Sequence, residues 1–125
     1  MVTFNNFLKL IRFNNLIIAF LVILETAFLL DTSFSSQLIL CILIILSFMA
    51  FGYIMNDIID YETDVINHKK RPLNRGIFSE KFCYVLATFF FFMGLICSFF
   101  VNYNSQKIIL YCLIPLLFSY NFLFK

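Results

Sequence analysis

Apolar residues form four long runs along the chain, and one long polar segment separates the second run from the third. The runs cover residues 14–31, 38–56, 82–101 and 108–124, and the polar segment covers residues 57–81. A helix needs roughly 17 to 25 mostly apolar residues to cross the hydrocarbon core of a bilayer, and each run has about this length. The pattern therefore predicts an all-α fold, a multi-pass transmembrane helical bundle of four helices, with residues 1–125 in a single domain.

The composition indicates the same class of protein. Of the 125 residues, 62% are hydrophobic and 13% are charged, whereas soluble proteins carry about 25% charged residues. A cleaved signal peptide is an alternative interpretation of the first run, because Lys9 and Arg12 precede it. However, the run lacks a small-x-small cleavage site before Asp31, and three more runs follow. We therefore expect a membrane span, with residues 4–13 as an interfacial helix that leads into it.

Basic residues predict how the chain is oriented. With the N-terminus inside, eight of the nine Lys and Arg residues face the cytoplasm, and only Lys107 faces outward. We therefore expect a multi-pass protein of the cell membrane, surrounded by membrane lipids, with the N-terminus and segment 57–81 on the cytoplasmic side. The net charge of +2 is small, and the basic residues lie among acids, so nucleic-acid binding is not expected.

The cysteines and the single histidine do not suggest a site. All four cysteines lie in apolar runs without metal-site spacing, and we interpret them as small hydrophobic residues. His68 stands alone in the polar segment. Neither a Cys/His zinc site nor a Ser/His/Asp triad can be assembled, so any chemistry is expected in segment 57–81.

Acidic residues concentrate where the second run ends, and four of the chain's seven lie there, namely Asp57, Asp60, Glu62 and Asp64. Asn56, Asp60 and Asp64 are four residues apart, so on one helix they share a face that drifts by about 40° per step. Asp57 is offset by roughly 100° but can share the site, while Glu62 points away and is expected to be solvated. Carboxylates at this spacing repel each other, so we expect a cation to bind nearby and offset their charge.

The residue types narrow the choice of cation and ligand. Oxygen ligands without Cys or His favour Mg²⁺, which proteins hold with one or two carboxylates and substrate phosphates. Lys69, Lys70, Arg71 and Arg75 follow the acids, and such side chains are the usual partners of phosphate oxygens. Pro72 keeps the backbone of Arg71 extended. Simpler alternatives stay open: the other three cations can be topology residues, and the carboxylates can be a solvated helix end.

These residues resemble a known family. The chain contains Asn56-Asp57-x-x-Asp60-x-x-x-Asp64, then Ile66-Asn67, then Arg71-Pro72-Leu73 and Gly76. This order of residues resembles the first signature of the UbiA superfamily of intramembrane prenyltransferases. Two shorter segments also resemble it. Arg12-Phe13-Asn14-Asn15 is similar to the Arg-Pro-x-Asn that opens the family's first helix, with Phe13 in place of Pro, and residues 120–125 resemble the end of its fourth helix.

The resemblance implies a partial UbiA-type fold and an activity. Members transfer an isoprenyl group, with Mg²⁺, from an isoprenyl diphosphate to a lipophilic acceptor, which is an aromatic compound, a tetrapyrrole or a glycerophosphate lipid. Carried over to this chain, the implied metal ligands are Asp57, Asp60 and Asp64, and Asn56 joins them as a catalytic residue. The implied diphosphate-binding residues are Arg12, Asn15, Lys69, Lys70 and Arg71.

One departure from the family bears on activity. The family carries a second Asp-x-x-x-Asp motif in its later half, whereas the remaining acids of this chain are Glu25, Asp31 and Glu80, none at that spacing. Three interpretations stay open: an N-terminal fragment of a longer enzyme, a degenerate short product, or half of a split enzyme completed by a carboxy-terminal half. A non-catalytic membrane protein that binds a lipid diphosphate or a partner without turnover is the alternative function.

A rival enzyme class fits the sequence less well. The CDP-alcohol phosphatidyltransferases also carry aspartates on membrane helices and use Mg²⁺. Their signature requires Gly after the first aspartate, whereas Ile58 follows Asp57 here.

Overall fold

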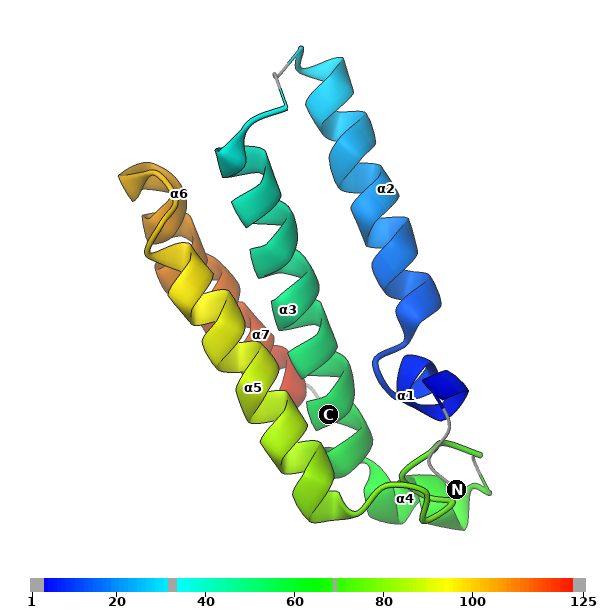
Figure 1. The fold of residues 1–125 in the computed structure, drawn as a ribbon. Helices are drawn as coiled ribbons and strands as arrows, with labels where there is room; N and C mark the ends of the chain where they lie inside the picture. The colour runs from blue at the N-terminus through cyan, green and yellow to red at the C-terminus, as the bar shows by residue number, and fades with distance from the viewer. Residues whose placement is uncertain (1–3, 32–33, 69, 123–125) are drawn as a thin grey trace.

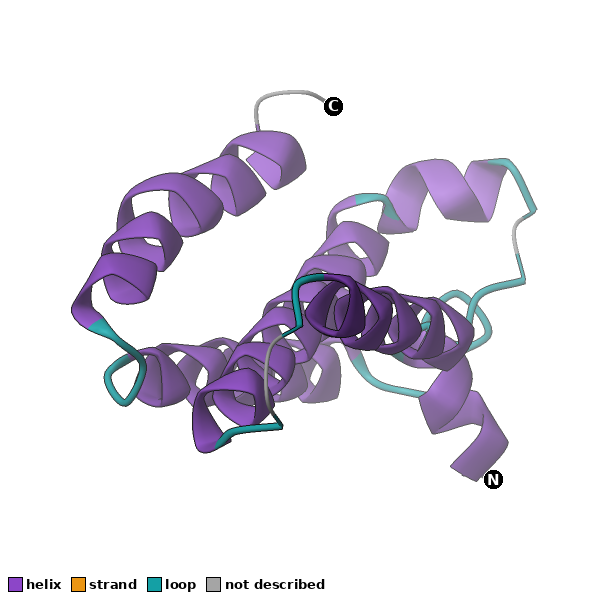
Figure 2. Ribbon diagram, turned by 90° about the horizontal axis from the view of Figure 1, so that it is seen from above, coloured by secondary structure: helices purple, strands orange, loops and turns teal. Residues whose placement is uncertain are grey.

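The computed structural model describes residues 4–31, 34–68 and 70–122, and every regular element in these ranges is a helix (Figures 1 and 2). The predicted all-α fold is therefore confirmed. In chain order the elements are α1 (Phe4–Leu10), α2 (Phe13–Leu29), α3 (Ser36–Ile59), α4 (Tyr61–Ile66), α5 (Glu80–Ser98), α6 (Tyr103–Ile108), the π-helix η1 (Ile109–Leu113) and α7 (Ile114–Phe122).

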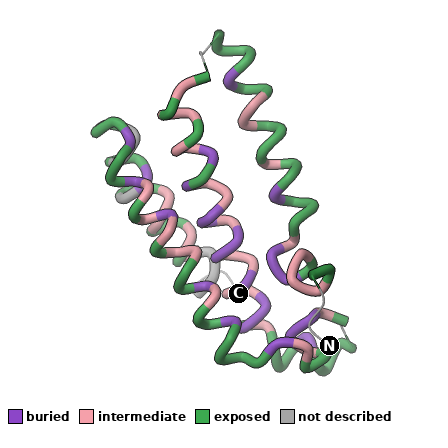
Figure 3. The backbone as a smooth tube through the Cα atoms, in the orientation of Figure 1, coloured by how far each residue is buried: buried purple, intermediate pink, exposed green. Residues whose placement is uncertain are grey.

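Helix α3 is the centre of the fold. It packs chiefly against α5, and it also contacts α2 and α7. Figure 3 shows the buried positions concentrated along α3, while much of α2 is exposed. Serine side chains cap the N-termini of α3 and α5. Ser35 accepts a hydrogen bond from the Leu38 N–H, and Ser79 accepts one from the Phe82 N–H. These caps explain why α3 and α5 each begin slightly before the apolar run that predicted them.

Aromatic side chains fill the contact between α3 and α5. Phe48 is 1% exposed and meets the Phe91 ring edge-on, with ring centroids 5.9 Å apart. Gly94 lets α5 approach closely, because a Cβ atom there would lie 3.2 Å from the Phe48 ring. Phe51 continues the cluster and stacks obliquely on Phe91 at 5.2 Å. Close packing of this kind stabilises helix pairs where lipid tails remove the hydrophobic driving force.

The helices account for two or three membrane spans by length and composition. Helices α3 and α5 are each long and apolar enough to cross a bilayer. Helices α1 and α2 meet the same criterion together, but they bend by 61° at their junction. The exposed face of α2 is apolar, as expected for contact with lipid, and includes Ile17, Ile18 and Leu21. Helix α1 covers residues 4–10 of the predicted lead-in segment 4–13, and its position at the membrane interface stays a prediction.

The fourth predicted span, residues 108–124, is divided. The π-helix η1 separates α6 from α7, and residues 123 and 124 lie outside the described part of the chain. Pro115 gives a physical reason, because it has no N–H to donate to the carbonyl four residues earlier. The preceding N–H, from Ile114, instead reaches the carbonyl of Ile109, five residues back. Whether this segment spans the membrane stays a prediction, and so does the orientation of the chain.

Candidate functional site

The polar segment is more helical than the sequence predicts. Residues 57–59 complete α3, and α4 follows at Tyr61. Asp60 lies at the junction, where it is both the C-cap residue of α3 and the N-cap residue of α4. The single helix that the spacing implies is interrupted at this one residue, where the Asp60 carbonyl also accepts a hydrogen bond from the Thr63 hydroxyl at 2.9 Å.

The helical register nevertheless continues through the junction. The Asp60 N–H donates to the Asn56 carbonyl at 3.0 Å, and the Asp64 N–H donates to the Asp60 carbonyl at 2.8 Å. Asn56, Asp60 and Asp64 therefore still succeed one another at intervals of one turn, as the spacing predicts.

Two buried carboxylates are held by two arginines, and we call Arg12, Asp57, Asp64 and Arg71 the ion-pair cluster. The Asp57 side chain is 3% exposed, and its Oδ1 accepts from Arg12 Nη2 at 2.8 Å and also from Arg71 Nη1. Arg71 Nε lies 2.9 Å from Oδ2 of Asp64, whose side chain is 1% exposed. Buried charges are costly unless they are paired, so these contacts explain how α3 and α4 carry carboxylates in their packed face.

Asp60 has a different environment. It is half-buried, and its Oδ2 accepts a hydrogen bond from the Asn56 side chain at 3.3 Å. Asp60 is therefore less buried than Asp57 and Asp64. The predicted carboxylates thus differ in their surroundings, with Asp57 and Asp64 in the ion-pair cluster and Asp60 beside the Asn56 amide.

Arg12 and Arg71 reach the cluster from outside α3 and α4. Arg12 connects α1 to α2 in the left-handed backbone conformation, φ 51° and ψ 53°, and its guanidinium also lies over the Tyr53 ring, 4.9 Å from the centroid. Sequence reasoning missed Tyr53, although it lies one turn before Asp57 on α3. Arg71 begins a turn that Gly76 completes with φ 65°, where the Gly76 N–H donates to the Leu73 carbonyl at 2.9 Å.

The remaining predicted site residues are exposed or lie outside the described chain. Asn15 is exposed near the start of α2, and Lys70 is exposed after α4. Lys69 lies outside the described residues. The structure thus brings together Asp57, Asp64, Arg71 and Arg12, and it leaves the diphosphate-binding roles of the other cations as predictions.

The donor set can be tested against Mg²⁺. Within the described ranges no three His, Cys, Asp or Glu side chains gather closely enough to hold a metal, so a site made of protein carboxylates alone is not assembled. Mg²⁺ commonly takes only one or two carboxylates, with waters and substrate phosphates filling the other positions. Asp60 and Asp64 fit that smaller requirement as oxygen donors one turn apart. The Asp57 oxygen that meets both arginines is less suited to the role.

Two pockets lie along these helices. The first, of about 350 Å³, lies at the bend between α1 and α2, and five of its seven lining residues are polar, namely Asn5, Lys9, Arg12, Asn14 and Asn15. The second, of about 250 Å³, is apolar and lies between α3 and the segment from α6 to η1. At about 1.5 Å per residue, Ile44 in its lining lies roughly 20 Å along α3 from Asp57. The apolar space is therefore remote from the ion-pair cluster, whereas Arg12 of that cluster lines the polar space.

Comparison with known proteins identifies the family. The model of the UbiA prenyltransferase family matches residues 16–125, which include α3, α4 and the Arg71 turn. The chain belongs to the UbiA prenyltransferase family. The resemblance drawn from the motif is thereby confirmed, and the UbiA family is one of enzymes that transfer isoprenyl groups.

Two curated UbiA-type relatives carry the same name. A digeranylgeranylglyceryl phosphate synthase from Thermococcus kodakarensis is 38% identical over 64 residues, covering 51% of this chain and 23% of the relative. One from Methanosphaera stadtmanae is 25% identical over 118 residues, covering 94% of this chain and 43% of the relative. The chain therefore spans less than half the length of either relative. No solved structure gives a significant match.

Proposed function

We propose that the junction of α3 and α4 binds the diphosphate of an isoprenyl diphosphate together with Mg²⁺, as part of isoprenyl transfer to a lipophilic acceptor. One observation carries the proposal: Arg71 Nε lies 2.9 Å from Oδ2 of Asp64, and Asp64 follows Asp60 by one helical turn. The site thus combines carboxylates suited to a hard cation with a guanidinium suited to phosphate oxygens. Membership of the UbiA family supports the same reaction class.

In this proposal Asp60 provides the first contact with the metal. Asp60 is half-buried, so its carboxylate is more accessible to a cation than those of Asp57 and Asp64. Its Oδ2 accepts a hydrogen bond from the Asn56 side-chain amide. Bound Mg²⁺ would offset charge on the diphosphate and so help it leave. Asn56 orients the Asp60 carboxylate through the hydrogen bond at 3.3 Å.

Arg71 would exchange partners when the diphosphate binds. Its guanidinium contacts both Asp57 and Asp64, and its side chain is 22% exposed. Movement of the guanidinium from Asp64 to a phosphate oxygen would free Asp64 as a second oxygen donor for the metal. Asp57 is buried and contacts both arginines, so we assign it the role of a positioning residue that keeps Arg12 and Arg71 at the site.

The names of the two relatives favour a glyceryl phosphate lipid as the acceptor. The Lys and Arg distribution favours a membrane orientation with the N-terminus and the α3–α4 junction on the cytoplasmic side. A single cysteine placed at Asn67, with the four native cysteines replaced, should then resist a membrane-impermeant thiol reagent in intact cells. Efficient labelling at this position would show that the α3–α4 junction faces outward and would contradict the proposed orientation.

A transfer assay tests the proposed function. Radiolabelled geranylgeranyl diphosphate and a glyceryl phosphate lipid would be supplied with Mg²⁺ to the chain alone, and to the chain co-expressed with the remaining part of the Methanosphaera relative. We expect labelled lipid on co-expression, and loss of that label in Asp60→Ala. Binding of the diphosphate without transfer in either arrangement would favour the second candidate, a binding protein without turnover. The chain spans less than half the length of each relative, so the assay also supplies the remaining part.

A further inference from the structure

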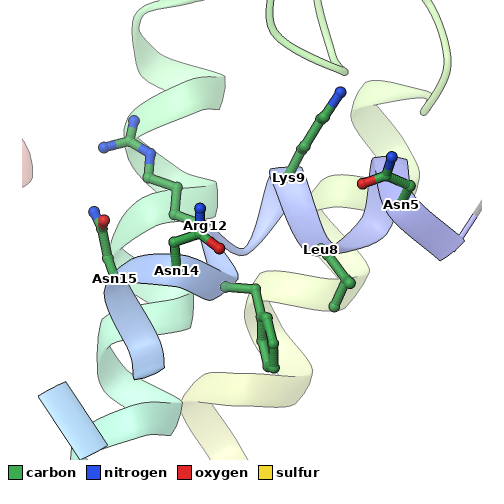
Figure 4. Close-up of a pocket in the computed structure, with 7 residues that line it drawn as sticks. Asn5, Leu8, Lys9, Arg12, Asn14 and Asn15 are labelled. Carbon is green, nitrogen blue, oxygen red and sulfur yellow. The ribbon is translucent and has the colours of Figure 1, made fainter. Parts of the chain in front are cut away.

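The pocket between α1 and α2 carries cations and amides but no carboxylate. Lys9 and Arg12 supply the cations, and Asn5, Asn14 and Asn15 supply the amides. Figure 4 shows Asn5, Lys9 and Arg12 extending to one side of the bend, while Leu8 extends to the other. A lining of this kind suits an anion with several hydrogen-bond acceptors.

The bend that forms this pocket is fixed on both sides. Leu10 and Ile11 are buried at 0% and 7% exposure, and they anchor the end of α1 in the core. The Arg12 side chain is tied to Asp57, which anchors the start of α2. The left-handed conformation of Arg12 costs about 1 to 2 kcal/mol for an L-residue, and these anchors hold it in place. The pocket is therefore built into the fold.

The backbone of α2 adds to the attraction for anions. Arg12 is the N-cap residue, and its side chain makes no capping hydrogen bond. Asn14 and Asn15, in the first turn of this 17-residue helix, line the pocket. The Asn15 N–H donates to the Arg12 carbonyl at 2.8 Å, so the helix contributes chiefly through its dipole, which favours negative charge at this end.

Lys9 gives the pocket its net positive charge. The guanidinium of Arg12 is offset by Asp57 at 2.8 Å. Lys9 is exposed, and within the described ranges no carboxylate pairs with it. One cation in the lining is thus committed to the ion-pair cluster, and the other is available to a ligand.

We propose that this pocket binds the phosphate monoester headgroup of the lipid acceptor, an inference that rests on the proposed function. A phosphate monoester carries about −1.5 to −2 charge and three acceptor oxygens, which fit Lys9, the amides and the helix terminus. The exposed apolar face of α2, with Ile17 and Ile18, starts beside the pocket and offers a surface for the lipid chains. The Arg12 side chain lines the pocket and also pairs with Asp57. The acceptor headgroup and the diphosphate would therefore bind on opposite sides of Arg12.

Binding of a water-dispersed phosphate monoester lipid tests the pocket. The probe is dihexanoylglyceryl phosphate, titrated onto the full chain in phosphatidylcholine nanodiscs. We expect Lys9→Gln to weaken its binding about tenfold, the value of one charge-assisted contact, and Asn5→Ala to weaken it several-fold. Lys81→Gln is the matched control, since Lys81 is an exposed cation on α5, and it should change the affinity by less than about twofold.

A second ligand separates this pocket from the α3–α4 junction. The affinity of a non-reacting isoprenyl thiolodiphosphate should not change in Lys9→Gln. An equal loss for both ligands would overturn a separate headgroup pocket, as would unchanged lipid binding in Lys9→Gln. If phosphatidylglycerol nanodiscs compete as strongly as the monoester, the site recognises membrane phosphodiesters and the acceptor assignment is overturned. If the thiolodiphosphate fails to bind the unaltered chain while the monoester binds through Lys9, the proposed function fails and the anion pocket stands.

Discussion

Two parts of α3 are built on different principles, an apolar part around Ile44 and Phe48 and a polar end around Asp57. Ile44 and Phe48 are each 1% exposed and belong to a hydrophobic cluster that includes residues of α5 and η1. Asp57 is 2% exposed but depends on arginines 45 and 14 residues away in sequence. The apolar part is held by close contact, and the polar end by charge pairs. The polar end is thus maintained despite its desolvation cost, as expected for residues that act on a ligand.

Removing the Phe48 side chain, in the apolar part of α3, should have the largest effect on stability. Phe48→Ala would leave a cavity between α3 and α5, and we expect a loss of about 3 to 5 kcal/mol in the free energy of unfolding. Denaturant titration of the chain in detergent measures it. Phe92→Ala is the matched control, because Phe92 is 52% exposed on α5. A loss as small as that of the control would contradict the packing account.

Removing the shared carboxylate of the polar end should have the next largest effect. Asp57→Ala leaves Arg12 and Arg71 without their common acceptor, and we expect a loss of about 1 to 3 kcal/mol in the free energy of unfolding. The arginine side chains are 32% and 22% exposed, so solvent reduces the penalty below that of a fully buried pair.

The same variant should also weaken diphosphate binding, whereas Phe48→Ala should reduce stability alone. Asp57→Glu, which keeps the charge, should restore part of the affinity if Asp57 positions the arginines. Glu62→Ala serves as the control, because Glu62 is exposed. An affinity that is the same in Asp57→Ala and in the unaltered chain would remove the positioning role.

A pair of glycine substitutions should give the smallest and most specific effect. At Gly94 a Cβ atom would meet the Phe48 ring at 3.2 Å, whereas at Gly52 it would meet Leu117 at an ordinary 3.5 Å. Both substitutions gain helix propensity, but only Gly94→Ala forces a neighbour to move. We therefore expect Gly94→Ala to be less stable than Gly52→Ala by about 1 kcal/mol in unfolding free energy. Equal stabilities would show that α5 can shift away from Phe48.

The sequence predicts the local features of the site and misses its long-range contacts. The four-residue spacing of Asn56, Asp60 and Asp64 predicts their shared face, because helix periodicity depends only on nearby residues. The pairing of Asp57 with Arg12 depends on the left-handed backbone at Arg12, and no glycine marks that position in the sequence. The family resemblance groups Asp57 with the metal ligands, and its contacts with both arginines become visible only in the fold.

Two element boundaries were also beyond the pattern of apolar residues. The break at Asp60 is a single residue between α3 and α4, which the pattern of apolar residues does not record. The division of the last apolar run follows from Pro115, whose missing N–H disturbs a stretch that reads as a continuous apolar helix. The helix class was predictable from this pattern, whereas the two interruptions were not.

The most direct test of the central claim is the Mg²⁺ dependence of isoprenyl thiolodiphosphate binding at the α3–α4 junction. The titration would compare the unaltered chain with Asp60→Ala and with Glu62→Ala, which removes an exposed carboxylate two residues away. We predict that binding requires Mg²⁺, falls on the order of 100-fold in Asp60→Ala, and is unchanged in Glu62→Ala. Binding that persists in EDTA, or an Asp60→Ala variant that binds as tightly as the unaltered chain, would contradict a metal and diphosphate site at this junction.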